Sequence, residues 1–405
     1  MPKPGMPSII IVASSAPPLG GGGISTAHYN LFTILKRRGL PVSLATFCDR
    51  PVAAKEEGIH RFGGSPFLIN LLHLILWLYL KLKGSRKLAY QVADIIAAFP
   101  GAFRLNRFLR TVKPDIILLP DHGAPGLFIA VGENCRLFLM AHHNPARFVG
   151  NPLLGDFCLL DAELAVSLEK RVLRKFSGVI CPSEYMRNSM ETTFGIDSST
   201  TVIPNVVDIE EILSTPKANL DEYSGLSSES TVIYIPSAGS RLKGSRFVFE
   251  IIRRLSSTSK KALGFYLSGE INEELAEELQ HVSSNARLIM PGRLSYHDHL
   301  ALVKICSFGI SPTLIESFGM AILEAGCCGL PMVTFNVGGT GEIISDGNNG
   351  YLVPYLDVEQ LIAKAEMLLD KQSCSLMALK TKAYLDQRFN QDEIVDKLLR
   401  FIGVE

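Results

Sequence analysis

Residues 311–331 read Ser311-Pro-Thr-Leu-Ile-Glu316-Ser-Phe-Gly319-Met-Ala-Ile-Leu-Glu324-Ala-Gly-Cys-Cys-Gly-Leu-Pro331. We expect a strand to end near Pro312, a loop to follow, and a helix to run from near Ser317 to the stop at Gly329-Leu-Pro331. The start of such a helix presents free backbone N–H groups and a positive dipole end, which together favour a bound anion such as a diphosphate.

Two carboxylates flank this expected anion site. Glu316 lies beside it, and Glu324 follows eight residues later. If both belonged to the helix, a rise of 1.5 Å per residue would separate them by about 12 Å, the reach from a sugar ring across a diphosphate to a ribose. They would then accept hydrogen bonds from sugar and ribose hydroxyls. On the spacing alone, the favoured interpretation is a surface glutamate and an unrelated helical glutamate.

Short β-branched runs alternate with helical patterns along all 405 residues, which is typical of parallel sheets covered by helices. We expect two Rossmann-like α/β domains whose parallel sheets face each other across a cleft, over residues 1–208 and 209–384, with a C-terminal helix at 385–405 packing back on the first domain. The junction is placed in the proline- and serine-rich stretch 208–230. The expected buried strands are residues 8–13, 41–47, 115–119, 136–140, 178–181, 201–203, 231–235, 263–267, 287–290, 308–310 and 331–334.

The residues around Glu316 and Glu324 resemble the family-4 retaining glycosyltransferases of the GT-B fold. The resemblance covers the two glutamates, the Gly-Leu-Pro turn, Gly338-Gly339 with Glu342, and the segments 346–354 and 291–294, and it is strongest over residues 231–356. It implies that a nucleotide sugar binds mainly to the second domain and the acceptor mainly to the first. The donor-side residues that it implies are Glu324, Ser317, Phe318, Gly319, Met320, Gly292 and Arg293.

A cationic segment, Ser240-Arg241-Leu-Lys243-Gly244, follows the expected strand 231–235 and precedes an amphipathic helix. A cation here would stabilise the charge that develops on a departing nucleoside diphosphate, and we assign this role to Lys243. The family pattern places an arginine about five residues before the Lys-Gly pair, whereas Arg241 lies two before it, so the role of Arg241 stays open. The alternative is a solvated pair of cations at a helix start.

In the first domain the loop Gly20-Gly-Gly22-Gly23 follows the first strand and opens a helix. It lacks the G-x-G-x-x-G dinucleotide fingerprint, which argues against a dehydrogenase. The resemblance places Gly22 and Gly23 opposite the donor phosphates, and a plain flexible turn is the alternative.

A histidine pair, His142-His143, follows the expected strand 136–140, where side chains enter the ligand crevice of a parallel sheet. The resemblance favours His143 as a hydrogen-bond partner of the donor sugar, with general-base catalysis as an alternative, and a metal pair is a weak competitor. Elsewhere, Ser183 and Ser295 fit helix caps, and Asn205 is expected to be structural.

We therefore expect a retaining glycosyltransferase that moves a sugar from a UDP- or GDP-sugar to a glycan or lipid-linked acceptor, in cell-surface polysaccharide or glycolipid biosynthesis. A nucleotide-sugar epimerase of the same fold and a non-catalytic sugar-nucleotide-binding protein are the alternatives. The chain has no Asp-x-Asp pair, so we expect neither a metal nor another cofactor. Forty basic and forty acidic residues cancel, which argues against nucleic acid as a partner.

Residues 67–113 carry a candidate membrane surface. The apolar run 67–80 is too short to span a bilayer and contains Asn70 and His73, while the following segment has eight basic residues and one acid, Asp94. An apolar stretch beside a basic cluster fits an anionic bilayer, and a buried helix with a solvated basic face fits equally well. The eight cysteines form no CxxC pair, so we expect reduced thiols and a cytoplasmic protein, peripheral on the inner face of the cell membrane. The eight basic residues are Lys81, Lys83, Arg86, Lys87, Arg104, Arg107, Arg110 and Lys113.

Overall fold

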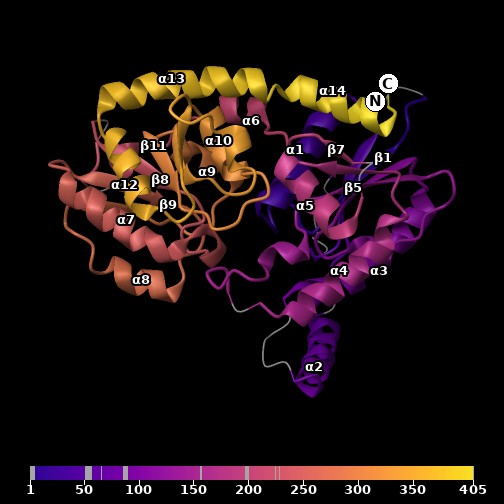
Figure 1. Cartoon of the computed structure of the whole chain (residues 1–405). Helices are drawn as coiled ribbons and strands as arrows, with labels where there is room; N and C mark the ends of the chain where they lie inside the picture. The colour runs from indigo at the N-terminus through magenta and orange to yellow at the C-terminus, as the bar shows by residue number, and fades with distance from the viewer. Residues whose placement is uncertain are drawn as a thin grey trace. The chain divides into compact units, whose positions relative to one another are not determined.

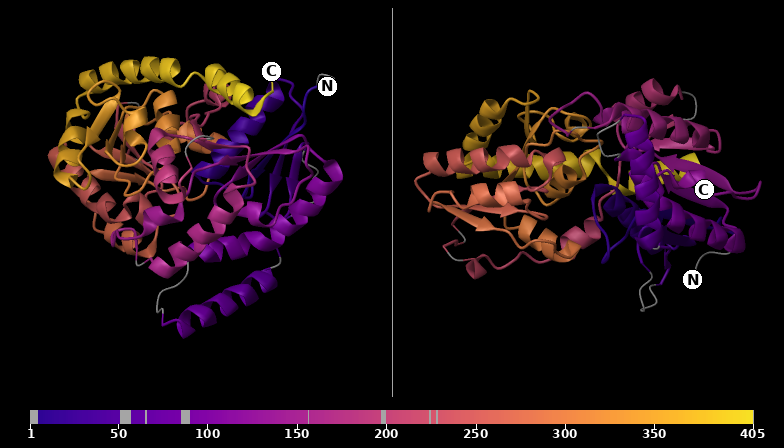
Figure 2. Two further views of the ribbon diagram at one scale, coloured as in Figure 1. Left: turned by 45° about the vertical axis from the view of Figure 1, so that its right-hand side comes forward. Right: turned by 90° about the horizontal axis from the view of Figure 1, so that it is seen from below.

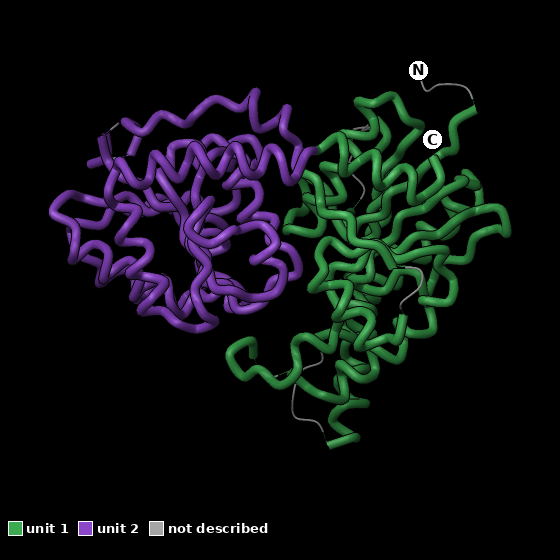
Figure 3. The backbone as a smooth tube through the Cα atoms, turned by 45° about the horizontal axis from the view of Figure 1, so that its top comes forward, with its two compact units in different colours: residues 1–206, 391–405 green, residues 207–390 purple. Residues whose placement is uncertain are grey.

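The computed structural model describes residues 5–50, 57–64, 66–84, 90–155, 157–196, 200–223, 225–227 and 229–404. The chain divides into two compact units, one of residues 1–206 with 391–405 and the other of residues 207–390 (Figure 3). Two of the eight basic residues, Arg86 and Lys87, and two serines of the stretch 208–230, Ser224 and Ser228, lie outside the described part.

The described part of unit 1 contains one seven-stranded parallel sheet in the order β3-β2-β1-β4-β5-β6-β7. Its central strands are runs of aliphatic residues buried on both faces, as expected where helices cover a parallel sheet on both sides. The strands are β1 (Ile9–Ala13), β2 (Val42–Thr46), β3 (Ile59–Arg61), β4 (Ile116–Pro120), β5 (Arg136–Met140), β6 (Gly178–Cys181) and β7 (Thr200–Val202).

The helices of unit 1 surround this sheet (Figure 1). The C-terminal helix α14 belongs to this unit: Ile394, Val395 and Leu398 are buried, and the Phe401 ring lies 5.6 Å from that of Phe138 on β5. Arg38 holds it further through carboxylate contacts at 2.5 Å with Asp392 and Asp396. The helices are α1 (Gly23–Arg37), α2 (Pro66–Leu82), α3 (Gln91–Val112), α4 (Leu159–Leu173), α5 (Glu184–Phe194) and α14 (Gln391–Ile402), with short turns at η1 (Pro125–Leu127) and η2 (Pro145–Phe148).

Unit 2 holds a six-stranded parallel sheet within its described residues, in the order β10-β9-β8-β11-β12-β13. A core cluster of buried aliphatic and aromatic residues forms between this sheet and its covering helices. The strands are β8 (Thr231–Ile235), β9 (Leu263–Leu267), β10 (Ala286–Ile289), β11 (Phe308–Ser311), β12 (Met332–Phe335) and β13 (Gly350–Val353). The helices are α6 (Ile209–Ser214), α7 (Ser245–Thr258), α8 (Glu273–Leu279), α9 (Tyr296–Val303), α10 (Met320–Cys327), α11 (Thr340–Ile343), α12 (Val358–Met367) and α13 (Lys371–Arg388), with turns at η3 (Leu220–Glu222) and η4 (Arg241–Lys243).

The prediction of two α/β domains with parallel sheets is confirmed. The eleven strands expected from sequence all form, four of them with the expected bounds and the other seven with one or both ends displaced by one residue. Two strands were missed. β3 has only three residues, and β13 starts inside the polar turn 346–350, so neither shows a long apolar run.

No helix in the described ranges is both long enough and apolar enough to cross a bilayer. The eight cysteines are free thiols, and burial raises the pKa of several of them, including Cys327 and Cys328 to about 12.

Candidate active site

The two neighbouring strands β8 and β11 lie where the strand order of unit 2 reverses. From β8 the chain proceeds to β9 and β10 on one side, then returns to β11 on the other. In such sheets the loops at the carboxyl ends of the strands diverge at this point and leave a crevice for a ligand. The loop after β8 carries Lys243, and the loop after β11 carries Glu316. Sequence segments more than seventy residues apart therefore meet at one edge of the sheet.

Lys243 and Glu316 form an ion pair. The Lys243 Nζ atom lies 2.6 Å from Glu316 Oε2, and the two side chains are 33% and 16% exposed. The other carboxylate oxygen, Oε1, accepts a hydrogen bond from the Ser317 backbone N–H at 3.1 Å. The structure thus brings together three of the predicted site residues and leaves the cation within reach of solvent.

Gly244 makes the close approach of the two loops possible. Its φ is +83°, and a Cβ atom placed there would lie 2.0 Å from the Pro312 carbonyl oxygen. A hydrogen bond of 3.0 Å from the Leu314 N–H to the Leu242 carbonyl links the same loops. Only glycine fits this position, so the Lys-Gly pair serves to set Lys243 against the Glu316 loop.

Gly338 and Gly339 support the Glu316 loop from the other side. A Cβ atom on Gly338 would lie 1.8 Å from the Glu316 carbonyl oxygen, and one on Gly339 would lie 2.7 Å from that of Ser317. Thr340 holds this glycine turn by accepting from the Val337 N–H and donating to the Phe335 carbonyl. The backbone of residues 316–318 is therefore packed tightly against a second loop.

The expected helix start near Ser317 is wrong. Helix α10 begins at Met320, and Gly319, with φ of +117°, is its N-cap. Residues 316–318 continue the loop because Gly338 and Gly339 pack against their backbone. Glu316 therefore lies outside the helix, and the 12 Å separation derived from helical rise does not apply. The free N–H groups at the start of α10 still follow directly after this loop.

Phe318 and Met320 turn their side chains into the interior. Phe318 is buried with its ring 5.9 Å from that of Phe389, and Met320 is also buried. Their contribution to an anion site would come from the backbone alone. Arg241 and Arg293 are exposed, and Gly292 takes a φ of +74° in the loop before α9.

Glu324 is a buried carboxyl group on α10. Burial raises its pKa to about 7, although a hydrogen bond of 3.2 Å from the Tyr296 hydroxyl partly offsets this effect. A buried carboxyl with one protein partner retains acceptor capacity for a ligand hydroxyl. A buried carboxyl group with a perturbed pKa is a functional-site candidate.

The raised pKa of Glu324 predicts a stability trend with pH. Between the unfolded value of 4.5 and the folded value of about 7, the folded protein keeps the proton that the unfolded chain has lost, so stability falls as pH rises through this window. Replacing Glu324 with glutamine should flatten that fall and raise the melting temperature at pH 8 relative to wild type. Thermal melts at pH 5 and pH 8 measure the first effect, and an unchanged pH slope in Glu324→Gln would contradict it.

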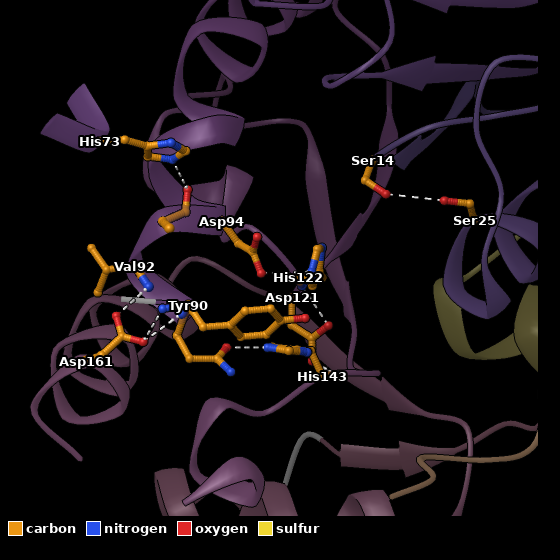
Figure 4. A network of polar contacts seen from close by, with 12 residues as sticks. Ser14, Ser25, His73, Tyr90, Val92, Asp94, Asp121, His122, His143 and Asp161 are labelled. Carbon is orange, nitrogen blue, oxygen red and sulfur yellow. Dashed lines mark hydrogen bonds and ion pairs between the residues drawn. The ribbon is translucent and has the colours of Figure 1, made fainter. Parts of the chain in front are cut away.

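In unit 1, Asp121 organises the two sequence-predicted histidines. Its Oδ2 atom accepts from the backbone N–H groups of His142 and His143 at 2.8 and 2.7 Å, and its Oδ1 accepts from that of His122. Asp121 follows β4 and the histidine pair follows β5, so the carboxylate ties two neighbouring strand ends together (Figure 4). The His142 ring bonds to Asn205 Oδ1 at 2.9 Å. Asn205 thus fixes a side chain beside the site.

His143 is buried and its pKa is well below the usual value because of burial and the neighbouring His122 and Arg147. Its Nε2 atom lies 2.5 Å from Gln91 Oε1 (Figure 4). Gln91 begins α3, whose first backbone N–H groups are capped by Asp161. A neutral imidazole held in this way can exchange hydrogen bonds with a hydroxyl but is a weak base at neutral pH. The geometry therefore favours the hydrogen-bonding role over general-base catalysis.

His122 is a candidate residue that the sequence analysis missed. Its Nε2 lies 3.4 Å from Asp94 Oδ2, and its ring stands edge-on to His143 at 4.9 Å (Figure 4). Burial alone would lower its pKa, but the Asp94 hydrogen bond and the charges of Asp94 and Asp121 outweigh burial and raise it. The sequence contained a signal for His122, because it follows the end of a buried strand as His143 does. β4 also lies at the strand-order reversal of its sheet, next to β1.

The glycine loop after β1 is braced by a buried ion pair that the sequence did not indicate. Arg61 on β3 contacts Asp49 at 2.5 Å and donates to the Ala16 and Pro17 carbonyls, while Asp49 accepts from the Ala16 N–H. Gly22, with φ of +126°, is the N-cap of α1, and Gly23 is its first residue. A Cβ atom at Gly22 would meet nothing within 4 Å, so this turn is open on its outer side.

Other predicted features have structural roles. Ser183 and Ser295 cap α5 and α9 by accepting from backbone N–H groups three residues on, as predicted. His299 accepts or donates between two stacked tyrosines, with its ring 2.7 Å from the Tyr266 hydroxyl, and burial lowers its pKa to about 4. Among the residues that the structure describes, no three His, Cys, Asp or Glu side chains are placed to hold a metal ion.

Two family models match the sequence in succession. The family described as Glycosyltransferase Family 4 matches residues 21–211, and the one described as Glycosyl transferases group 1 matches residues 217–387. Together they span both units, and the second contains Lys243, Glu316 and Glu324.

The chain spans about half the length of the curated relatives that it matches. The chain is 26% identical over 195 residues to an uncharacterized glycosyltransferase of Methanocaldococcus jannaschii, which covers 48% of this chain and 50% of that protein. It is 27% identical over 209 residues to a GDP-mannose-dependent alpha-(1-6)-phosphatidylinositol monomannoside mannosyltransferase of Mycolicibacterium smegmatis, with 49% and 54% covered.

A solved structure matches across nearly the whole chain. The Anabaena protein HepE, in complex with UDP-glucose, superposes with a TM-score of 0.68 at 19% identity over 98% of this chain and 99% of that one. At this identity the match establishes a shared fold. With the two parallel sheets and the two family models, it shows that this chain belongs to the group 1 glycosyltransferases of the GT-B fold, with an N-terminal region of the family-4 type.

Proposed function

We propose that this protein is a retaining glycosyltransferase that transfers a sugar from a UDP- or GDP-sugar to a glycan or lipid-linked acceptor. The observation that carries the proposal is the pairing of Lys243 with Glu316 between the loops after β8 and β11. The M. smegmatis relative uses GDP-mannose and the Anabaena structure holds UDP-glucose, which supports a nucleotide sugar as the donor class.

In this proposal the two members of the ion pair bind different parts of the nucleotide sugar, Lys243 the diphosphate and Glu316 the sugar. A diphosphate at the start of α10 would draw the Lys243 ammonium toward its oxygens, because a dianion attracts it more strongly than one carboxylate. As the bond between the sugar and the diphosphate breaks, negative charge grows on the leaving group, and the ammonium lowers the energy of that state. Lys243 is therefore the proposed leaving-group cation.

Glu316 is the proposed sugar-holding group. Its two oxygens accept from Lys243 and from the Ser317 N–H, so the carboxylate is held in one orientation before a ligand arrives. When Lys243 moves to the diphosphate, hydroxyl groups of the donor sugar could donate hydrogen bonds to the Glu316 oxygen that Lys243 has left. Attack by an acceptor hydroxyl on the face from which the diphosphate leaves, with the hydroxyl proton passing to the departing diphosphate oxygen, would retain the anomeric configuration without a covalent enzyme intermediate.

Glu324 and His143 are the other two proposed donor-binding side chains. Glu324, buried on α10 with acceptor capacity, would bond to ribose hydroxyls. His143, neutral and held by Gln91, would bond to the donor sugar. The proposed setting is the synthesis of cell-surface polysaccharide or glycolipid by a cytoplasmic protein, peripheral on the membrane, without a metal or another cofactor.

Product analysis tests the reaction class. The protein would be incubated with UDP- and GDP-sugars with and without glycan or lipid-linked acceptors, and the products analysed by mass spectrometry and NMR. Transfer to the acceptor with the donor's anomeric configuration supports the proposal. Conversion of the donor without an acceptor would point to an epimerase, and binding without turnover in any combination would point to a non-catalytic protein.

A further inference from the structure

Helix α2 exposes apolar side chains that no described part of the protein covers. Eight large apolar residues on this one helix are between 43% and 87% exposed. Six of them recur at the spacing that places side chains on one face of a helix, and Trp77 and Tyr79 lie at its borders. The eight residues are Phe67, Leu71, Leu74, Ile75, Trp77, Leu78, Tyr79 and Leu82.

The opposite face of α2 attaches the helix to unit 1. Leu80 is buried, Leu76 packs against the cluster that includes Val92 and Ile95 of α3, and the His73 ring bonds to the Ala93 carbonyl. Figure 2 shows α2 as the outermost helix of its unit, beside α3. The helix is therefore fixed to the protein along one side and open along the other.

The charge of α2 and of the segments next to it in the sequence indicates which kind of partner its open face would bind. Residues 66–84 contain no acidic residue, and Lys81 in the last turn of the helix and Lys83 directly after the helix are both exposed. The Lys81 ammonium lies 4.8 Å from the centre of the Trp77 ring, so an aromatic and a cation stand together at this end. Arg107 and Arg110 near the end of α3, and Lys113 directly after it, are also exposed, while Asp94 near the start of α3 contacts His122. An apolar face with basic and aromatic borders complements an anionic lipid surface.

We propose that α2 lies in the plane of an anionic phospholipid bilayer, with its apolar face in the acyl boundary and its lysine end among the headgroups. At 1.5 Å per residue, 17 residues give a helix of about 25 Å, shorter than the ~30 Å hydrocarbon core. Only the open face of α2 can face the bilayer, because Leu76 and Leu80 on the opposite face are packed against unit 1. This inference rests on the proposed peripheral location and names the element responsible for it.

The fluorescence of Trp77 can test this inference without a label. Trp77 is the single tryptophan in 405 residues, and it borders the open face. Titration with vesicles of phosphatidylglycerol and phosphatidylcholine should shift its emission to shorter wavelength, and lipids brominated on their acyl chains should quench it. Vesicles of phosphatidylcholine alone should bind at least about tenfold less, because the electrostatic attraction is missing.

A matched pair of variants separates membrane insertion from general surface apolarity. Leu74→Glu with Leu78→Glu changes the open face of α2 without touching its packed side. Leu376→Glu with Leu379→Glu makes the same change on α13, where both residues are also exposed. The α2 variant should lose at least about tenfold in vesicle binding, because two side chains that would enter the acyl boundary become charged. The α13 variant should bind as wild type.

Three results would overturn the inference. The first is absence of vesicle binding in flotation assays, and the second is equal binding of the two double variants. The third is a concentration-dependent dimer in sedimentation that the α2 variant abolishes, which would show that a second copy covers this face. Because the readout is lipid binding, failure here leaves sugar transfer untouched, and absence of transfer leaves this result untouched.

Discussion

Replacing Lys243 with alanine is expected to lower kcat about 100- to 1,000-fold, with a smaller effect on the binding of the intact donor. The reason is that the ammonium opposes charge that appears fully only as the diphosphate leaves, and removing one such electrostatic contact typically costs about 3–4 kcal/mol in the transition state. Steady-state kinetics with the preferred donor measure the effect.

The control for this substitution is Arg246→Ala. Arg246 is an exposed cation three residues further along the chain, stacked over Phe247 at 5.5 Å, and it has no place in the proposed site. Its removal should leave kcat within about twofold of wild type, the range expected for a surface substitution. A Lys243→Ala enzyme that turns over as fast as Arg246→Ala would remove Lys243 from the mechanism.

Replacing Gly338 with alanine is expected to lower the free energy of unfolding by about 2–4 kcal/mol and to reduce activity sharply. The added Cβ would lie 1.8 Å from the Glu316 carbonyl oxygen, so either the glycine turn or the Glu316 loop must shift. A small displacement of Glu316 away from Lys243 disrupts the geometry on which transfer depends. Urea unfolding and kinetics measure the two effects.

Gly347 provides the matched control. Its φ of +73° is as unfavourable for alanine as the +59° of Gly338, but a Cβ atom there meets nothing within 4 Å. Gly347→Ala should therefore show only the conformational cost, about 1 kcal/mol, and keep its activity. If both variants were equally stable and active, the packing of Gly338 on the Glu316 loop would be unimportant.

The parts of the fold that could be predicted are those encoded in local patterns. The strands 136–140, 178–181, 231–235 and 263–267 are aliphatic or aromatic runs bounded by polar segments, and the structure has them with the predicted bounds. The start of α10 could not be predicted, because Ser317 is a good helix N-cap by sequence. The packing of Gly338 and Gly339 from another loop keeps residues 316–318 non-helical.

The candidate site was only partly accessible to sequence reasoning. Lys243 and Glu316 were each identified, but their contact at 2.6 Å depends on β8 and β11 being neighbours, which no local pattern encodes. His122 was missed although it follows a strand end, because a single histidine at that position is a weaker sequence signal than the pair His142-His143. The exposure of α2 likewise could not be read from its apolar sequence, since a buried helix has the same composition.

Calorimetric titration of UDP, GDP, ADP and their common sugars into wild type and Lys243→Ala tests the central claim most directly. The account predicts that at least one nucleoside diphosphate binds the wild type, and that Lys243→Ala binds the same nucleotide at least about tenfold more weakly because a charge-assisted contact to the diphosphate is lost. Failure of every sugar nucleotide to bind, or equal affinity in the two proteins, would contradict a diphosphate site built on Lys243 and the loop at Glu316.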